Sequence, residues 1–190
     1  MSRRWVLPIA SVLIAGLCAW RMSRPPRPTP QVSPSTPRAL PPRGWELPDH
    51  EFRLVKFDRF LGRHPVVVRF FDGSQPAEED ELLVWLRDND DELNDAGWQT
   101  IAISTARPAE VRASEERTGK LWPFPVLTDM HLRDPAPAPV HHLWSRVNRE
   151  TGELLPAVFL VDRMGYVDYE NGRPKPIEHP LPTLEALIAR

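Results

Sequence analysis

Eight prolines lie between residues 23 and 44, and they limit where a folded domain can begin. Proline has no backbone N–H and a fixed φ angle, so a stretch this rich in proline is not expected to form a helix or a sheet ladder. The stretch also holds four arginines and no acidic residue. We therefore predict an extended proline-rich linker over residues 23–44, between an N-terminal segment, residues 1–22, and one domain, residues 45–190.

Residues 5–20 of the N-terminal segment carry no charge and would be apolar on every face of a helix. As a helix they would rise about 24 Å, slightly less than the roughly 30 Å of a hydrocarbon core. Tryptophans at both ends suit the membrane interface, and arginines flank the segment at positions 3, 4, 21 and 24. We predict a signal-anchor, transmembrane helix that makes the membrane a partner of the chain. A cleaved signal peptide is the alternative, although residues 17–20 offer few of the small residues that a cleavage site needs.

Charge is unevenly spread along the chain. Seven of the 24 Lys and Arg residues precede position 45, whereas all 26 Asp and Glu residues follow it. The domain is therefore acidic, which argues against a nucleic-acid partner because binding to phosphates needs a basic face. The basic N-terminal stretch lies next to the apolar segment and points to a membrane surface instead.

Cys18 is the only cysteine, and it lies within the apolar segment. An intramolecular disulfide and a cysteine-based metal site are both excluded, and any thiol mechanism would have to use this residue.

The domain alternates strand and helix patterns. The run PVVVRFF at 65–71 is typical of a buried strand, and residues 77–96 combine helical apolar spacing with an acidic start and a closing Gly97. We predict an α/β fold with a central mixed sheet and helices on both faces. Further strands are expected at 98–104, 124–129, 156–162 and 166–170, and further helices at 108–118, 140–148 and 181–189.

Histidine spacing does not indicate a metal site, and we predict neither a metal nor a cofactor. No two of the histidines have the i, i+4 spacing of helical ligands, and we interpret them as surface or loop residues. Nucleotide-binding fingerprints, G-x-S-x-G and HExxH are absent from the sequence. The tryptophans of the domain fit core positions better than a ligand platform. The residues concerned are His50, His64, His131, His141, His142 and His179, and Trp85, Trp98, Trp122 and Trp144.

Three segments in order resemble the thioredoxin-like superfamily, in its peroxiredoxin and redoxin branch of the alkyl hydroperoxide reductase/thiol-specific antioxidant type. They are GRHPVVVRFFDGSQPAEEDEL (62–82), FPVLTD (124–129) and LLPAVFLVDRMGYV (154–167). The resemblance covers roughly residues 46–188. It implies a thioredoxin-like sandwich, with the redox motif at the start of the helix after the first strand of this set and a cis-proline, Pro156, opposite that motif.

The positions that the resemblance assigns to the redox motif are Gln75, Pro76, Ala77 and Glu78. The family's chemistry needs a thiolate at a helix N-terminus, where the thiol pKa is lowered. Both cysteine positions hold other residues, so we predict a vestigial motif and no catalytic residue. Glu78 suits capping and dipole compensation at a helix start, and a catalytic Glu78 is the weaker alternative. Pro156 also departs from the peroxiredoxins, which use an arginine there.

Two main functions follow. The first is a membrane-anchored, redox-inactive thioredoxin-like domain that binds a protein or peptide partner by backbone pairing. The second is a thiol-dependent peroxidase or disulfide oxidoreductase, which the resemblance implies and the missing cysteines argue against. A small-molecule or metal binder using Glu78 and histidines is a third, weaker hypothesis. The resemblance favours a domain on the extracytoplasmic, periplasmic side, although the arginines that follow residue 20 pull against export.

Overall fold

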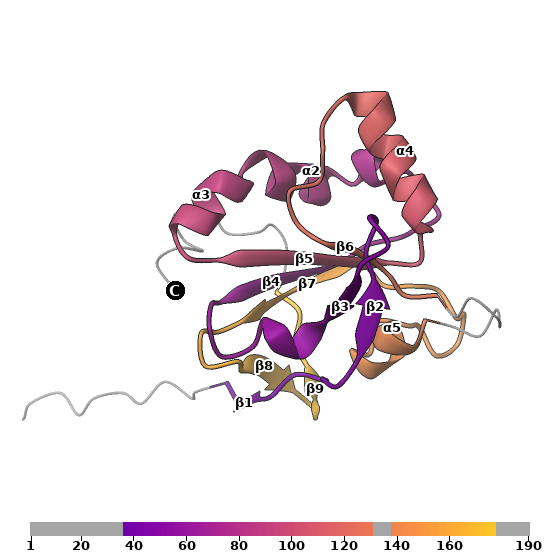
Figure 1. Ribbon diagram of the computed structural model, residues 1–190. Coiled ribbons are helices and arrows are strands. Elements are labelled where there is room, and N and C mark those ends of the chain that lie inside the picture. Colours follow the sequence, from indigo (N-terminus) through magenta and orange to yellow (C-terminus); the bar gives the residue numbers. More distant parts are fainter. Residues whose placement is uncertain (1–35, 131–137, 178–190) are drawn as a thin grey trace, which may run out of the picture. The chain divides into compact units, whose positions relative to one another are not determined.

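The computed structural model describes residues 36–130 and 138–177 of the chain (Figure 1). These residues form short strands and helices around one sheet. The elements in chain order are β1 Arg38–Ala39, β2 Glu46–Pro48, β3 Leu54–Lys56, the 3-10 helix η1 Phe57–Arg59, β4 Val66–Phe70, the 3-10 helix η2 Ala77–Glu79, α2 Glu81–Asp88, α3 Asp90–Asp95, β5 Gln99–Ser104, α4 Pro108–Thr118, β6 Val126–Thr128, α5 Pro139–Leu143, β7 Ala157–Val161, β8 Val167–Glu170 and β9 Arg173–Pro174.

The sheet is mixed, as the sequence predicts. Its strand order is β1-β8-β7-β4-β5-β6, and β9 pairs with β8. β4, β5 and β6 run parallel, whereas β7 is antiparallel to β4, and β8 is antiparallel to both β7 and β1. A separate hairpin, β2–β3, is attached through a bridge between Asp49 and Leu127 of β6.

β4 lies at the centre of the sheet, and every one of its residues is buried. Val66, Val68 and Phe70 face one core, while Val67 belongs to the core on the other face. Burial on both faces explains why this strand is a continuous apolar run and not an alternating one. Arg69 is the exception within the run, and its partner lies at the helix start described below.

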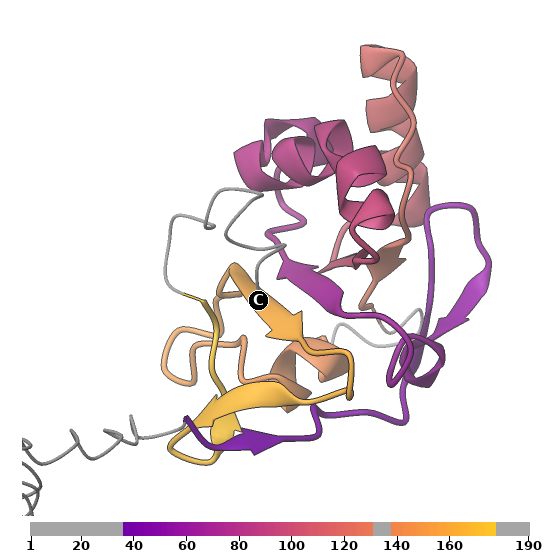
Figure 2. The same ribbon diagram turned by 90° about the vertical axis from the view of Figure 1, so that its left-hand side faces the viewer.

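Helices cover both faces of the sheet, which confirms that part of the predicted fold (Figure 2). α2, α3 and α4 pack on one face, through Leu83, Leu93 and Val111. α5 and η1 pack on the opposite face, where Trp144 and Phe57 join the core. The predicted strands all form, and α4 has the predicted bounds, with Gly119 closing it in a left-handed conformation.

The predicted single helix over residues 77–96 is wrong, because it is divided into η2, α2 and α3. Asp80 leaves the helical conformation, with φ −79° and ψ 101°, and its side chain accepts a hydrogen bond from the Leu83 N–H at 2.8 Å. Asn89, between α2 and α3, turns its side chain back to the Trp85 carbonyl at 2.8 Å. Short polar side chains that bind the backbone locally compete with the helix, and here they interrupt it.

The predicted helix at 140–148 ends much earlier, at Leu143. Ser145 adopts a φ of 56°, and the N–H groups of Ser145 and Arg146 bond back to the carbonyls of His142 and His141 at 3.0 and 2.7 Å. This is a Schellman motif, which terminates a helix and turns the chain away from its axis.

The linker prediction is wrong at its C-terminal end. Arg38 and Ala39 form β1 and pair with Asp168 and Val167 of β8, so part of the proline-rich stretch does form a sheet ladder. β1 is at the edge of the sheet, where neighbouring prolines interrupt little of the hydrogen bonding.

Three predictions fall outside the described residues: the apolar helix at 5–20, most of the linker, and the last helix at 181–189. Among the residues that the structure describes, no helix is long and apolar enough to cross a membrane.

Candidate functional site

The four motif positions lie at the start of a helical turn, directly after the loop that follows β4. Pro76 is the residue before η2, and its carbonyl accepts a hydrogen bond from the Glu79 N–H at 2.9 Å. Gln75 and Pro76 are exposed, whereas Ala77 is buried in the core beneath α2. The structure therefore places residues 75–78 between β4 and α2, and their assignment to a redox motif stays a prediction.

The loop before the motif is closely packed against the end of β5. The Asp72 carboxylate accepts hydrogen bonds from the backbone and the hydroxyl of Ser74, at 2.9 and 2.7 Å. A Cβ atom at Gly73 would approach the Ala106 nitrogen to 2.2 Å, so only glycine fits there. A groove of about 260 Å³ lies between this loop and α4, and residues 73–77, Ala106, Val111 and Arg117 are among those that line it.

Glu78 is bound by a partner on another helix. Its carboxylate accepts a hydrogen bond from the guanidinium of Arg117 in α4. That bond is the main cause that lowers the pKa of Glu78 from its ordinary value, against the opposing effect of burial. Glu78 therefore connects the start of the motif helix to α4, a role that capping alone did not predict.

Arg69 and Asp80 form a second ion pair, deeper in the same region. Arg69 is 5% exposed, and its guanidinium binds the carboxylate of Asp80, the N-cap residue of α2. Its Nε and Nη1 atoms are buried and have no hydrogen-bond partner. Sequence reasoning missed this pair, although an arginine within the apolar run PVVVRFF was a signal that a buried partner must exist.

Pro156 immediately precedes β7, and it is exposed together with Leu155. Ala157 is paired with Phe70, so the first residue of β7 and the last residue of β4 lie side by side at the same end of these strands. Pro156 and residues 75–78 thus lie beyond the same end of these strands. That Pro156 faces residues 75–78 directly stays a prediction. The Leu155 N–H already donates to the Arg146 carbonyl at 2.9 Å.

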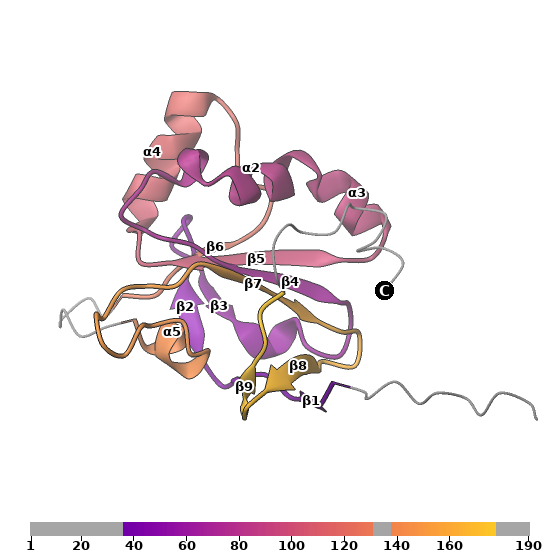
Figure 3. The ribbon, with the colours of Figure 1, turned by 180° about the vertical axis from the view of Figure 1, so that it is seen from behind.

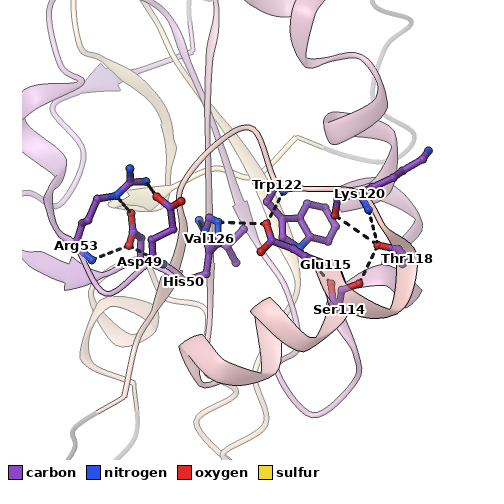
Figure 4. Close-up of polar contacts among 10 residues, drawn as sticks. Asp49, His50, Arg53, Ser114, Glu115, Thr118, Lys120, Trp122 and Val126 are labelled. Atoms are coloured by element: carbon purple, nitrogen blue, oxygen red, sulfur yellow. Dashed lines mark hydrogen bonds and ion pairs between the residues drawn. The ribbon is translucent and has the colours of Figure 1, made fainter.

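Two of the histidines are buried: His50 lies in the turn after β2, whereas His141 lies in α5, so the interpretation as a surface or loop residue is wrong for His141. His50 accepts a hydrogen bond from the Val126 N–H at 3.3 Å, and its Nε2 lies 3.6 Å from Glu115 of α4 (Figure 4). His141 binds the Asp129 carboxylate through Nδ1 at 2.7 Å. The partners of both histidines come from distant segments of the chain, so local sequence spacing could not predict them.

Among residues 36–130 and 138–177 no group of His, Cys, Asp and Glu is arranged to hold a metal ion. His64 contacts the Gly97 carbonyl and His142 is exposed, while His131 and His179 lie outside the described residues. Trp98, Trp122 and Trp144 are buried in the cores, as predicted, and Trp85 is partly buried.

Comparisons with known proteins agree with this architecture. The model of the AhpC/TSA family matches residues 41–170. No curated protein sequence matches the chain. The peroxidoxin BcpB of Mycobacterium tuberculosis has a similar structure, with a TM-score of 0.53, 19% sequence identity, and 70% of this chain and 85% of that one covered.

Two further solved structures are similar. The bacterioferritin comigratory protein of Xanthomonas campestris, described as reducing alkyl peroxides, gives a TM-score of 0.56 at 17% identity over 82% of this chain and 96% of that one. The thioredoxin domain of a thiol-disulfide oxidoreductase from Bacteroides vulgatus gives 0.51 at 20% identity, with 74% and 91% covered. At these identities the likeness concerns the fold, while the family model covers most of the chain. The chain therefore belongs to the AhpC/TSA family and carries its thioredoxin-like domain.

Proposed function

We propose that the chain is a membrane-anchored thioredoxin-like protein that performs no thiol chemistry and binds a protein or peptide partner. One observation carries the proposal: Gln75 and Glu78 stand at the two positions that the family resemblance assigns to cysteine, and the domain contains no cysteine. A glutamine amide and a carboxylate cannot cycle between oxidised and reduced states. The proposed anchor is residues 5–20, with the domain on the extracytoplasmic side.

Partner binding is supported by the exposed segment of chain that precedes β7, next to Pro156. Leu155 is 37% exposed, and a large apolar side chain at a strand start is a suitable contact for an extended chain. Because the Leu155 N–H is already bonded to Arg146, a partner would pair with the Leu155 carbonyl and pack on its side chain. We therefore expect backbone pairing in which the partner donates the hydrogen bond.

The alternative function is a thiol-dependent peroxidase or disulfide oxidoreductase. It is favoured by the family alone, since the comparison proteins described as peroxide reductases and oxidoreductases share the fold. In this chain such an enzyme would have to use Cys18, which is separated from the domain by the whole proline-rich linker.

A redox assay separates these two functions. The full-length chain in mild detergent should neither consume hydroperoxide nor reduce insulin above the rate without protein, and a Cys18→Ser variant should behave identically. Turnover that disappears in Cys18→Ser would support the thiol enzyme and overturn the proposal.

A crosslinking experiment tests partner binding. A photoreactive amino acid replaces Leu155 in the full-length chain, and membranes are washed with high salt before illumination. The chain should stay with the membranes, because an apolar span is not released by salt, and position 155 should give a discrete crosslinked product. The control is the same amino acid at Leu121, which is 76% exposed in the loop between α4 and β6. Equal crosslinked products at both positions, or no product at position 155, would count against a partner at Leu155.

A further inference from the structure

The chain after β9 returns to the sheet at β7, and Ile177 is the last residue that the structure describes there (Figure 3). The Ile177 N–H donates a hydrogen bond to the Val158 carbonyl of β7 at 2.9 Å. The Ile177 side chain packs against the core on the sheet face that α2, α3 and α4 cover. The residues that follow Ile177 therefore begin beside β7, on this face of the sheet.

On the same face, β7 is left partly open. Val158 is buried there, whereas Leu160 is only partly buried. Within the described part of the chain no helix packs extensively against β7, while α3 contacts β5 and α4 contacts β6. Leu160 and Trp98 line an open groove of about 270 Å³. Covering these apolar side chains would be favourable, because it removes apolar surface from water.

The chemistry of the groove suits apolar side chains. Three of the charged residues that line it bind one another, because Arg38 forms ion pairs with Asp162 at 3.4 Å and with Asp168 at 3.0 Å. The volume of the groove is slightly below the roughly 300–1,000 Å³ of typical small-molecule pockets. A few side chains from a neighbouring segment fit such a groove better than a charged or drug-sized ligand.

The sequence after Ile177 carries apolar residues at helical spacing. On the helix that the sequence predicts over 181–189, four of them would lie within one arc of about 120°. These four are Leu181, Leu184, Leu187 and Ile188. One face of this segment is thus apolar enough to need a partner surface.

The length of the segment matches the distance to the groove. A helix over 181–189 rises about 13 Å. The backbone of β7 from Val158, beside Ile177, to Asp162, at the groove, also spans about 13 Å. A helix that begins shortly after Ile177 is therefore long enough to lie along β7 as far as the groove.

We propose that residues 181–189 of this same chain form a helix that docks along β7 and places its apolar face in the groove at Leu160 and Trp98. The groove is then an intramolecular interface and is closed to other ligands and proteins. This inference does not depend on the proposed membrane anchor or on partner binding at Leu155.

Crosslinking identifies what occupies the groove. A photoreactive amino acid replaces Leu160 in the full-length chain in mild detergent, and the illuminated protein is digested and its crosslinked peptides are identified by mass spectrometry. An intramolecular crosslink to residues 181–189 is expected. The same amino acid at Leu121, which is 76% exposed between α4 and β6, is the control and should not reach those residues. A crosslink from position 160 to a second molecule instead, or none to residues 181–189, overturns the proposal.

Urea denaturation tests the docked face. Leu184→Asp should raise the equilibrium constant for unfolding at least about tenfold, because a leucine side chain loses its burial. Ala186→Asp is the matched control: it adds the same charge about 200° further around the helix and should leave the constant nearly unchanged. If Leu184→Asp does not fold, Leu184→Ala is the milder variant and should still destabilise the chain more than Ala186→Asp. Equal effects of the variants at 184 and 186 would contradict docking through this face.

Discussion

At the scale of single residues, the segment 75–80 contains no cysteine but makes specific contacts. Glu78 is bound by Arg117 of α4, and Asp80 caps α2 while it binds the buried Arg69. The residue types were readable from the sequence, and so was the absence of a thiol. The partners were not, because Arg117 is 39 positions from Glu78 along the chain.

The Glu78–Arg117 pair should make stability depend on pH. A carboxyl pKa that is lower in the folded state than in the unfolded state contributes stability above the unfolded-state pKa, and this contribution is lost as pH falls through the folded pKa. Glu78→Gln should therefore lower the free energy of unfolding by about 1 kcal/mol at pH 7, a modest value because Arg117 is half exposed. The difference should shrink as pH falls below about 4. Urea denaturation at several pH values measures it.

Glu79→Gln is the matched control, since Glu79 is the exposed neighbour and carries the same charge. Its free energy of unfolding should follow that of the unmodified chain at every pH. A Glu78→Gln deficit that persists unchanged in acid would show that the ion pair is not its cause.

At the scale of elements, local chemistry predicts where helices end only when the signal is itself local. α4 begins at Pro108 and stops at Gly119, and both signals lie within the helix pattern. The interruption at Asp80 could not be seen in the same way, because it is reinforced by an arginine on β4. β1 was missed for a related reason: its partner strand, β8, follows about 130 residues later.

The end of α5 offers a test of one of these stops. Ser145 has a φ of 56°, a conformation that strains a residue with a Cβ atom and suits glycine. Ser145→Gly should raise the free energy of unfolding by about 0.5 kcal/mol, after the entropy that glycine adds to the unfolded chain. Ser145→Ala keeps the Cβ atom and should not be stabilised. The prediction fails if both variants change stability by the same amount in thermal denaturation.

At the scale of the whole molecule, the ordered segments and their spacing predicted the family and the mixed sheet correctly. PVVVRFF and PAVFLVD form the adjacent strands β4 and β7, because continuous apolar runs are typical of strands that are buried on both faces of a sheet. The buried polar pairs His50–Glu115 and His141–Asp129 could not be predicted from the sequence, since each joins segments that only the folded chain brings together. The first pair joins the β2–β3 hairpin to α4, and the second joins α5 to the residue that follows β6.

We propose that residues 75–78 keep the shape of a redox motif and lack only its sulfurs. Restoring both cysteines, with Gln75→Cys and Glu78→Cys in a Cys18→Ser chain, tests this claim most directly. The two thiols would form a C-x-x-C at the start of η2, where backbone N–H groups and the helix dipole lower a thiol pKa. Under mild oxidation the chain should lose about 2 Da as an internal disulfide forms, because each thiol gives up one hydrogen. Gln75→Cys alone, also in the Cys18→Ser chain, should show no such loss. If the paired thiols stay reduced while a reference C-x-x-C protein oxidises, residues 75 and 78 do not stand as redox-motif neighbours, and the vestigial-site account is wrong.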